Sequence, residues 1–400
     1  MWSKIAIIGF NNITKEILND ENLNISKVLV ENINNLSDYD SNLLRNTLVE
    51  NINEIINDEE IKLIVNLNNN NLKLDNFIKC MGKGKHLIFL EDSIKFKDYK
   101  LLKKSAEKLN VTIKYSTDSL IDILNINKDN ITSIWGILDN VSNNIINIME
   151  NKKIDLKDAI NVYKSNYNKI DLINCIEGEK SKNKLRVIAS NIVNFDIPDE
   201  KIYVEGIENI NKVDIEYANK FNMAIKLLSI LKIKDDQLEA RVHPVMMPIK
   251  NKLVNILKDE IGIIIKSGDY GNFMISNDIG NYKVKANLIK DSIKNFNIGC
   301  IDKQYKKIKF KDIEGAYTKY YIRININNKP GIIGDITSIL GDYDVNIEYI
   351  ENTLIDNSNM SIVIVTSKCK EIQIIDAIDC IYELKPTIKI KNIIRIENFK

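Results

Sequence analysis

A glycine turn near the start of the chain is a candidate nucleotide-binding site. Gly9 follows the apolar run 4–8, and the sequence continues Phe-Asn-Asn-Ile-Thr over 10–14. A dinucleotide-binding turn has the pattern G-x-G-x-x-G, whose glycines allow the tight turn, the approach of the pyrophosphate and close helix packing. Only the first glycine is present, with Asn11 and Thr14 at the other two positions. Asn11 tolerates positive φ, but its side chain stands where the pyrophosphate should lie.

A carboxylate completes this candidate site. Glu31 lies 22 residues after Gly9, at the end of the second predicted strand. A carboxylate at that place binds the ribose hydroxyls and favours NAD over NADP. The candidate cofactor-binding residues are therefore Gly9, Asn11, Thr14 and Glu31, as a degenerate set. Two interpretations stay open: a weakened NAD(P) site, or a fold of this type that no longer binds a nucleotide.

A second candidate site lies at a turn near the C-terminus. The segment Asn-Asn-Lys-Pro-Gly over 327–331 follows a predicted strand and opens a predicted helix over 332–340. Proline at the first helical position presets φ, and glycine lets a ligand approach the free backbone N–H groups. Such a helix start favours a carboxylate. The candidate ligand-binding residues are Asn327, Asn328, Gly331 and Ile332; the alternative is a module that only dimerises.

Two lysines four residues apart form the third candidate site. Lys180 and Lys184 share one face of a predicted helix. Two like charges on one face repel a cation. Near 4 Å, the difference from a carboxylate–lysine pair is a few kcal/mol at an effective dielectric constant of ~20. The alternative is a solvated basic face on a lysine-rich helix.

Composition limits the class of protein. The 400 residues suggest two or three domains, and the net charge of +1 argues against a dedicated nucleic-acid binder. No run approaches the ~18–20 apolar residues of a membrane span, and no signal-peptide pattern precedes the first strand. The five cysteines are scattered and odd in number, which is typical of free thiols in a reducing cytoplasm. Two histidines give no basis for a histidine-based metal site.

The order of predicted elements gives an α/β protein in three parts. Residues 1–130 alternate apolar strands with polar helices, which is typical of a Rossmann-like, doubly wound parallel sheet. Residues 131–305 read as an α+β catalytic or dimerisation domain, and residues 306–317 as a linker. Residues 318–400 follow a β-α-β-β-α-β order. The predicted strands of the first part are 4–8, 27–30, 62–66, 86–90 and 112–115.

The block 202–248 closely resembles the catalytic domain of homoserine dehydrogenase. It predicts a strand at 202–207, a helix from about 213 to 221 with Asn211 as N-cap and Asp214 completing a capping box, and strands at 224–232 and 237–246. The resemblance rests on the following residues: Glu205-Gly206-Ile207, Ile210, Asp214-Ile215, Tyr217-Ala218, Ile225-Lys226-Leu227-Leu228, Arg241-Val242, Pro244 and Pro248.

The resemblance also assigns site residues. Lys184 matches the family's catalytic lysine, and Asp171 and Glu177 match substrate-binding positions. Acidic positions of the family are occupied here by Lys169, Cys175 and Lys180, and a family lysine after the fourth strand by Asp92. The family segment "GILNGTTN" becomes Gly-Ile-Leu-Asp-Asn-Val-Ser-Asn over 136–143. Most catalytic and cofactor motifs are thus degenerate.

The C-terminal turn resembles that of the ACT domain, a small amino-acid-sensing module that pairs edge to edge in dimers. Two functions follow from these resemblances. The first is a catalytically impaired regulatory relative of homoserine dehydrogenase in threonine and methionine metabolism. It would sense threonine or a similar effector and form a homo-oligomer or pair with an active paralogue, without NAD(P). The second is an active NAD(P)-dependent enzyme that interconverts homoserine and aspartate semialdehyde.

Overall fold

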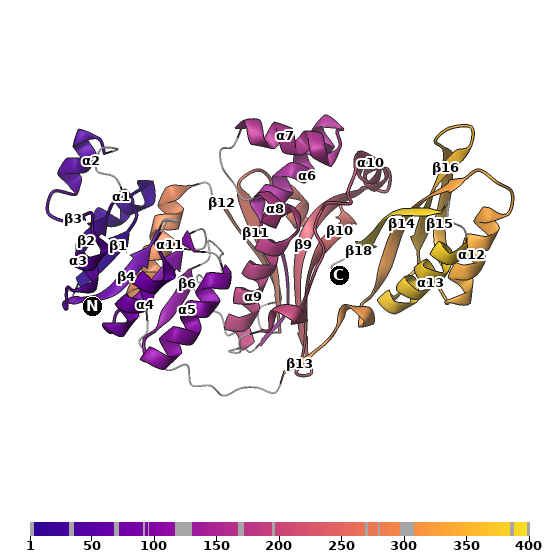
Figure 1. Ribbon diagram of the computed structural model, residues 1–400. Helices are drawn as coiled ribbons and strands as arrows, with labels where there is room; N and C mark the ends of the chain where they lie inside the picture. Colours follow the sequence, from indigo (N-terminus) through magenta and orange to yellow (C-terminus); the bar gives the residue numbers. More distant parts are fainter. Residues whose placement is uncertain are drawn as a thin grey trace. The chain divides into compact units, whose positions relative to one another are not determined.

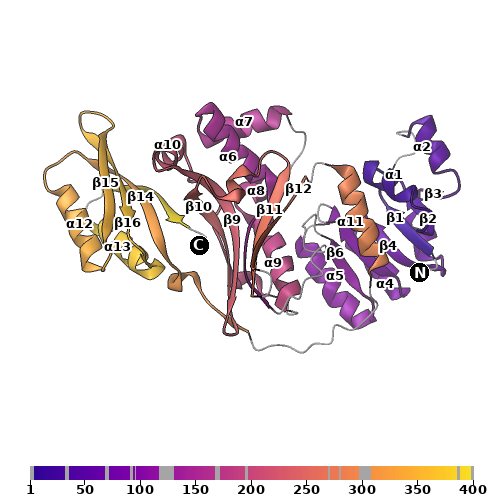
Figure 2. The same ribbon diagram turned by 180° about the vertical axis from the view of Figure 1, so that it is seen from behind.

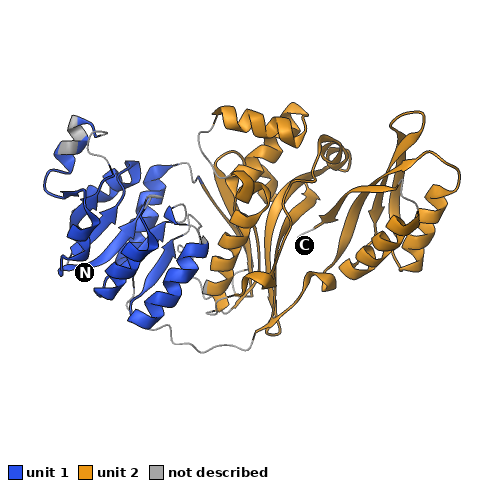
Figure 3. Cartoon of the chain, viewed as in Figure 1, with its two compact units in different colours: residues 1–124, 278–304 blue, residues 125–277, 305–400 orange. Residues whose placement is uncertain are grey.

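A computed structural model describes residues 4–31, 36–67, 72–90, 93–94, 96–116, 130–166, 172–193, 197–268, 271–278, 281–296, 308–384 and 388–397. The chain forms two compact units, residues 1–124 with 278–304 and residues 125–277 with 305–400 (Figure 3). Each unit has its own sheet. Among the described helices, none combines the length and the apolar character that a membrane span requires.

Unit 1 contains a six-stranded parallel sheet in the order β3-β2-β1-β4-β5-β6 (Figure 1). This is the strand order of the doubly wound dinucleotide-binding fold, so the predicted α/β class is confirmed. Its strands are β1 (Lys4–Ile8), β2 (Ile25–Leu29), β3 (Leu48–Val49), β4 (Ile61–Asn66), β5 (His86–Leu90) and β6 (Ile113–Ser116). Its helices include α1 (Asn12–Leu18), α2 (Asp38–Leu43), α3 (Ile52–Ile56), α4 (Leu74–Gly82) and α5 (Phe96–Leu109).

Helix α11 (Tyr282–Lys294) comes late in the chain but belongs to unit 1. Ala286, Ile289 and Ile293 are buried with side chains of β1 and β4 in one apolar core. Lys294 also forms an ion pair with Asp20 at 3.0 Å. The expected continuous domain 131–305 therefore differs from the structure at its end, because the apolar face of this helix packs on the first sheet.

The middle part of unit 2 is a mostly antiparallel sheet in the order β12-β11-β7-β9-β10. Figure 2 shows α6, α8 and α9 beside this sheet. The strands are β7 (Ile131–Ile137), β8 (Ile202–Val204), β9 (Met223–Lys234), β10 (Gln237–Pro248), β11 (Glu260–Ser267) and β12 (Gly271–Asp278). The helices are α6 (Asn140–Lys152), α7 (Leu156–Asn166), α8 (Leu172–Ile176), α9 (Glu179–Val193) and α10 (Lys212–Lys220). The elements predicted for the block 202–248 are confirmed, with the first strand shorter than expected.

The C-terminal part of unit 2 has the predicted β-α-β-β-α-β order, with one additional short strand. Its sheet runs β18-β14-β16-β15, and buried side chains of α12 and α13 pack in one core with those of the sheet. The elements are β14 (Tyr317–Asn327), α12 (Ile332–Asp342), β15 (Ile347–Leu354), β16 (Asn359–Thr366), β17 (Cys369–Lys370), α13 (Glu371–Leu384) and β18 (Lys389–Ile396). Within the expected linker, β13 (Lys309–Phe310) pairs with β10.

The two sheets of unit 2 are joined through β18. This strand pairs with β14 along most of its length and with β10 over two residue pairs, Val245 with Arg395 and Met246 with Ile396. The C-terminal part therefore continues the middle sheet and shares its compact unit, whereas the sequence suggested a separate domain after a linker.

Candidate functional site

The glycine turn after β1 is closed by the side chains that replace the missing glycines. Gly9 has a φ of +97°, as the tight turn requires. Asn11 is extended at φ −153°, so the positive φ that this residue type tolerates is not used. Its side-chain oxygen accepts hydrogen bonds from the backbone N–H groups of Ile13 at 2.9 Å and Thr14 at 3.1 Å. The Thr14 hydroxyl donates to the carbonyl of Gly9 at 2.9 Å.

The Asn11 N–H donates to the Thr14 hydroxyl at 3.3 Å, and with the bonds to the Asn11 oxygen this makes a complete capping box at the start of α1. These bonds satisfy the N–H groups that a pyrophosphate would otherwise engage at this turn. Glu31 is exposed and lies just beyond the carboxyl end of β2, the strand next to β1. The structure thus brings Gly9, Asn11 and Thr14 into one turn and leaves Glu31 accessible at the same edge of the sheet.

The segment with the lysines is held against the Glu-Gly-Ile motif by backbone contact. The Ile207 N–H donates to the carbonyl of Ile176 at 2.8 Å. A Cβ on Gly206 would lie 2.1 Å from that same carbonyl oxygen, so only glycine fits here. Gly178 has a φ of +79° and turns the chain from α8 into α9. The glycines of this region therefore place the lysine helix.

Lys180 and Lys184 both lie on α9, as predicted. Lys184 is buried at 1% exposure and Lys180 is half-buried, so neither belongs to a solvated face. Glu177 is exposed in the turn before the helix. Asp171, Lys169 and Asp92 lie outside the described residues. Of the two residues assigned by resemblance that the structure describes, Lys184 and Glu177, only the lysine is buried.

A buried carboxylate that the sequence did not single out, Asp139, lies near Cys175. Asp139 caps α6 and is 1% exposed. Its Oδ2 accepts a hydrogen bond from the Ser142 N–H at 2.8 Å, while Oδ1 is buried and accepts none within the described parts of the chain. Burial and the nearby Asp139 raise the pKa of the Cys175 thiol, and Lys180 and Lys184 lower it less.

Asp139, Cys175, Lys180 and Lys184 therefore share one electrostatic environment. The sequence predicted two like charges at this site, and Asp139, from a segment far away in sequence, adds a buried carboxylate near Cys175. Asp139 occupies the place of the asparagine in the family's "GILNGTTN" segment. This exchange of asparagine for aspartate was visible in the sequence and could have pointed to Asp139.

The C-terminal turn is exposed, but one of the residues expected to bind a ligand there is buried. Asn328 and Gly331 are exposed, and Gly331 is the N-cap of α12 with a φ of +89°. Pro330 thus precedes the N-cap, so the expectation of proline at the first helical position was wrong. Ile332 takes that position, and its side chain is 1% exposed within the core. Asn327 pairs with Asn359 in the sheet.

Buried charges fasten the C-terminal sheet to the middle part. Arg395 on β18 donates to Glu371 at 2.9 Å and to Glu205 at 2.8 Å. Arg241 on β10 donates to Glu397 at 2.5 Å. Burial, with Arg395 and Arg241 nearby, holds the pKa of His243 well below its usual range, so this histidine is neutral at pH 7. The Arg-Val-His-Pro block therefore has a structural role here.

The fold and the site define a class: a two-unit α/β protein that joins a dinucleotide-type sheet to an α+β unit with a lysine-bearing helix. The family model "Homoserine dehydrogenase" matches residues 120–291. The homoserine dehydrogenase of Helicobacter pylori is 25% identical over 366 residues, 86% of this chain and 85% of its own. That of Lactococcus lactis is 22% identical over 405 residues, 94% of this chain and 95% of its own.

Solved structures agree with this relationship. The homoserine dehydrogenase of Thiobacillus denitrificans has a TM-score of 0.81 at 20% identity, with 99% of this chain and 98% of that chain covered. A hyperthermophilic archaeal homoserine dehydrogenase mutant in complex with NADPH has a TM-score of 0.55 at 18% identity, covering 74% of this chain and 97% of that one. The chain belongs to the homoserine dehydrogenase family.

The family uses NAD(P). The residues at the start of α1 do not fit the pyrophosphate of such a cofactor in their present arrangement, because the amide of Asn11 already accepts the hydrogen bonds of Ile13 and Thr14. Asn11 and Thr14 place side chains in the turn where the fingerprint has glycine.

Proposed function

We propose that this protein is a catalytically impaired, regulatory member of the homoserine dehydrogenase family that senses an amino acid of the aspartate-derived group. The single observation that carries the first half of the proposal is the Asn11 side chain, which satisfies two N–H groups at the cofactor turn. A ligand would have to displace that cap, and would still meet a side chain where the family has none.

The sensing half of the proposal rests on the C-terminal part. Its β-α-β-β-α-β order and its Asn-Lys-Pro-Gly turn resemble an ACT domain, with threonine or a similar amino acid as effector. The regulatory reading includes assembly as a homo-oligomer or with an active paralogue. The buried ion pairs of Arg323 and Arg395 support the regulatory function, because they couple the C-terminal sheet to the middle part of the same chain.

A second candidate is an active NAD(P)-dependent homoserine dehydrogenase. One observation favours it: Lys184 and Asp139 are both buried in the same electrostatic environment as Cys175. A buried lysine can serve as a proton-transfer group, and Lys184 holds the position of the family's catalytic lysine. Glu31 would then select NAD over NADP.

The deciding experiment is calorimetric titration of the purified protein with NADPH, with NADH and with threonine. The proposal expects no nucleotide binding in the micromolar range and clear binding of threonine. Nucleotide binding together with oxidation of homoserine would establish the second candidate instead.

A variant tests the observation directly. Asn11→Gly removes the capping amide and frees the Ile13 and Thr14 N–H groups, so NADPH affinity should rise at least tenfold over the wild type. An N-cap Asn→Gly change costs only a few tenths of a kcal/mol, so the fold should be retained. Asn51→Gly, at the N-cap of α3, is the matched control and should leave NADPH affinity unchanged.

A further inference from the structure

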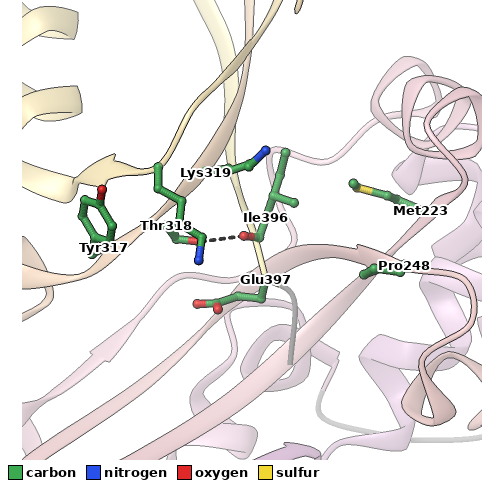
Figure 4. A pocket seen from close by; sticks show the side chains of 8 residues that line it. Met223, Pro248, Tyr317, Thr318, Lys319, Ile396 and Glu397 are labelled. Atoms are coloured by element: carbon green, nitrogen blue, oxygen red, sulfur yellow. Dashed lines mark hydrogen bonds between the residues drawn. The ribbon is translucent and has the colours of Figure 1, made fainter. Parts of the chain in front are cut away.

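A cavity of about 240 Å³ lies in unit 2 beside the junction of its two sheets (Figure 4). One part of its lining is apolar, from Met223, Pro248 and Ile396. The other part is charged, from Lys319, Lys368 and Glu397. The cavity therefore offers both signs of charge next to an apolar surface.

The sheet topology accounts for the position of this cavity. Strands β10 and β18 pair only at Val245–Arg395 and Met246–Ile396, after which the Glu397 N–H donates to the carbonyl of Met246 at 3.0 Å. The first residues of β14 cross nearby, where the Thr318 hydroxyl donates to the carbonyl of Ile396 at 2.5 Å. Figure 4 shows Met223 and Pro248 on the far side of the cavity from Thr318.

Glu397 is suited to bind an ammonium group. Its side chain is 12% exposed, and Arg241 holds one of its oxygens at 2.5 Å. A carboxylate fixed in this way at the wall of a cavity forms strong charge-assisted hydrogen bonds with a cation. Lys319, which also pairs with Glu348, and the exposed Lys368 supply positive charge for a carboxylate.

We propose that this cavity binds a free α-amino acid with a small uncharged side chain, a proposal that rests on the sensing function above. The ammonium contacts Glu397, the carboxylate contacts Lys319 and Lys368, and the side chain packs on the apolar wall. Pockets for drug-sized ligands occupy about 300–1,000 Å³, so this volume suits a single amino acid and excludes a dinucleotide.

Binding here has a structural consequence. Met223 and Pro248 belong to the middle part, whereas Lys319, Lys368 and Ile396 belong to the C-terminal part. An amino acid that touches both parts stabilises the arrangement in which they are docked. It shifts the population toward that arrangement by its difference in affinity for the docked and undocked forms.

The test is calorimetric titration of the full chain with threonine, valine and methionine, and with N-acetylthreonine, which lacks the ammonium. Lys368→Ala removes a charge from the lining, and Met223→Trp fills the cavity. At least one of the three amino acids should bind the wild type. Its affinity should fall at least tenfold in both variants, and N-acetylthreonine should not bind. Circular dichroism establishes that each variant is folded. If Met223→Trp does not fold, Lys368→Ala, at an exposed position, decides whether the cavity binds the amino acid.

Two control variants distinguish this cavity from other candidate binding sites. Lys370→Ala removes an exposed lysine on β17, outside the lining, and should bind as the wild type does. Asn328→Ala alters the turn before α12. Binding that survives Lys368→Ala and Met223→Trp but is lost in Asn328→Ala overturns the cavity and leaves the sensing function standing. If the wild type binds no amino acid, both the cavity proposal and the sensing function are overturned. If it binds a nucleotide as well as an amino acid in the cavity, only the proposed loss of catalysis is overturned.

Discussion

The guanidinium of Arg323 on β14 donates to both carboxylate oxygens of Asp214 on α10, at 2.7 Å from Nε and 3.2 Å from Nη2. The Tyr321 hydroxyl and the Asn392 amide donate to the same carboxylate at 3.1 and 2.9 Å. Asp214 is 0% exposed. It also completes the capping box with Asn211, so one residue both starts a helix of the middle part and anchors the C-terminal sheet.

Asp214→Asn should strongly destabilise the protein. Breaking a buried ion pair by removing one partner leaves an uncompensated charge on Arg323, which typically costs ~3–5 kcal/mol. The measurement is the free energy of unfolding from urea denaturation. Lys220→Ala is the comparison, because its ion pair with Glu351 is solvent-exposed and should contribute less than ~1 kcal/mol. Equal losses in the two variants would contradict a structural role for the buried pair.

Lys226 should make stability rise with pH. This residue of β9 is buried, with Nζ donating to Asn143 at 3.0 Å and to Asn147 at 2.6 Å on α6. Burial lowers its pKa from the usual 10.5 to about 8. The folded state therefore disfavours the charged form, and this cost disappears as pH rises from about 8 to 10.5.

The measurement compares wild type with Lys226→Met in urea at pH 7 and pH 10. The difference in unfolding free energy between the two proteins should shift by about 2 kcal/mol in favour of the wild type at the higher pH, since one pKa unit corresponds to ~1.4 kcal/mol. Other groups that titrate in this range cancel in the comparison. A difference that does not change with pH would show that Lys226 keeps its ordinary pKa.

Asp139→Asn tests the buried carboxylate near Cys175. Asparagine is as good an N-cap as aspartate, so α6 should keep its start while the negative charge is lost. If the site binds homoserine through its ammonium, affinity should fall at least tenfold, because Lys180 and Lys184 would then face the ammonium without a counter-charge. Homoserine titration calorimetry measures this. Asp158→Asn, an equal charge change on the exposed side of α7, should leave affinity as it is.

Two glycines of α12 should respond in opposite directions to alanine. Gly331 has a φ of +89°, whereas Gly334 lies within the helix, and an added Cβ meets no atom within 4 Å at either position. Gly331→Ala should cost ~1–2 kcal/mol, because alanine is strained at positive φ. Gly334→Ala should gain ~0.5–1 kcal/mol from helix propensity. Thermal unfolding compares the two, and stabilisation by Gly331→Ala would contradict the assigned turn.

The short-range features of this protein were predictable. The capping box of Asn211 and Asp214 is confirmed because its hydrogen bonds close within three residues of the chain. The strands of unit 1 are confirmed because parallel strands buried on both faces give short, nearly continuous apolar runs such as Ile5 to Ile8. The family resemblance of the block 202–248 is confirmed as well, since its glycine and its strand order serve the scaffold.

The sequence by itself thus determined the element order, the fold class and the family, because periodicity, capping and turn chemistry are local. Only the tertiary structure placed α11 on the first sheet, Asp139 beside Cys175, and Arg323 against Asp214. Each of these contacts joins segments far apart in sequence, and no local pattern fixes which distant segment will cover an apolar face or satisfy a buried charge. The packing of the whole chain makes that choice, since every buried apolar face and every buried charge must find its partner at once.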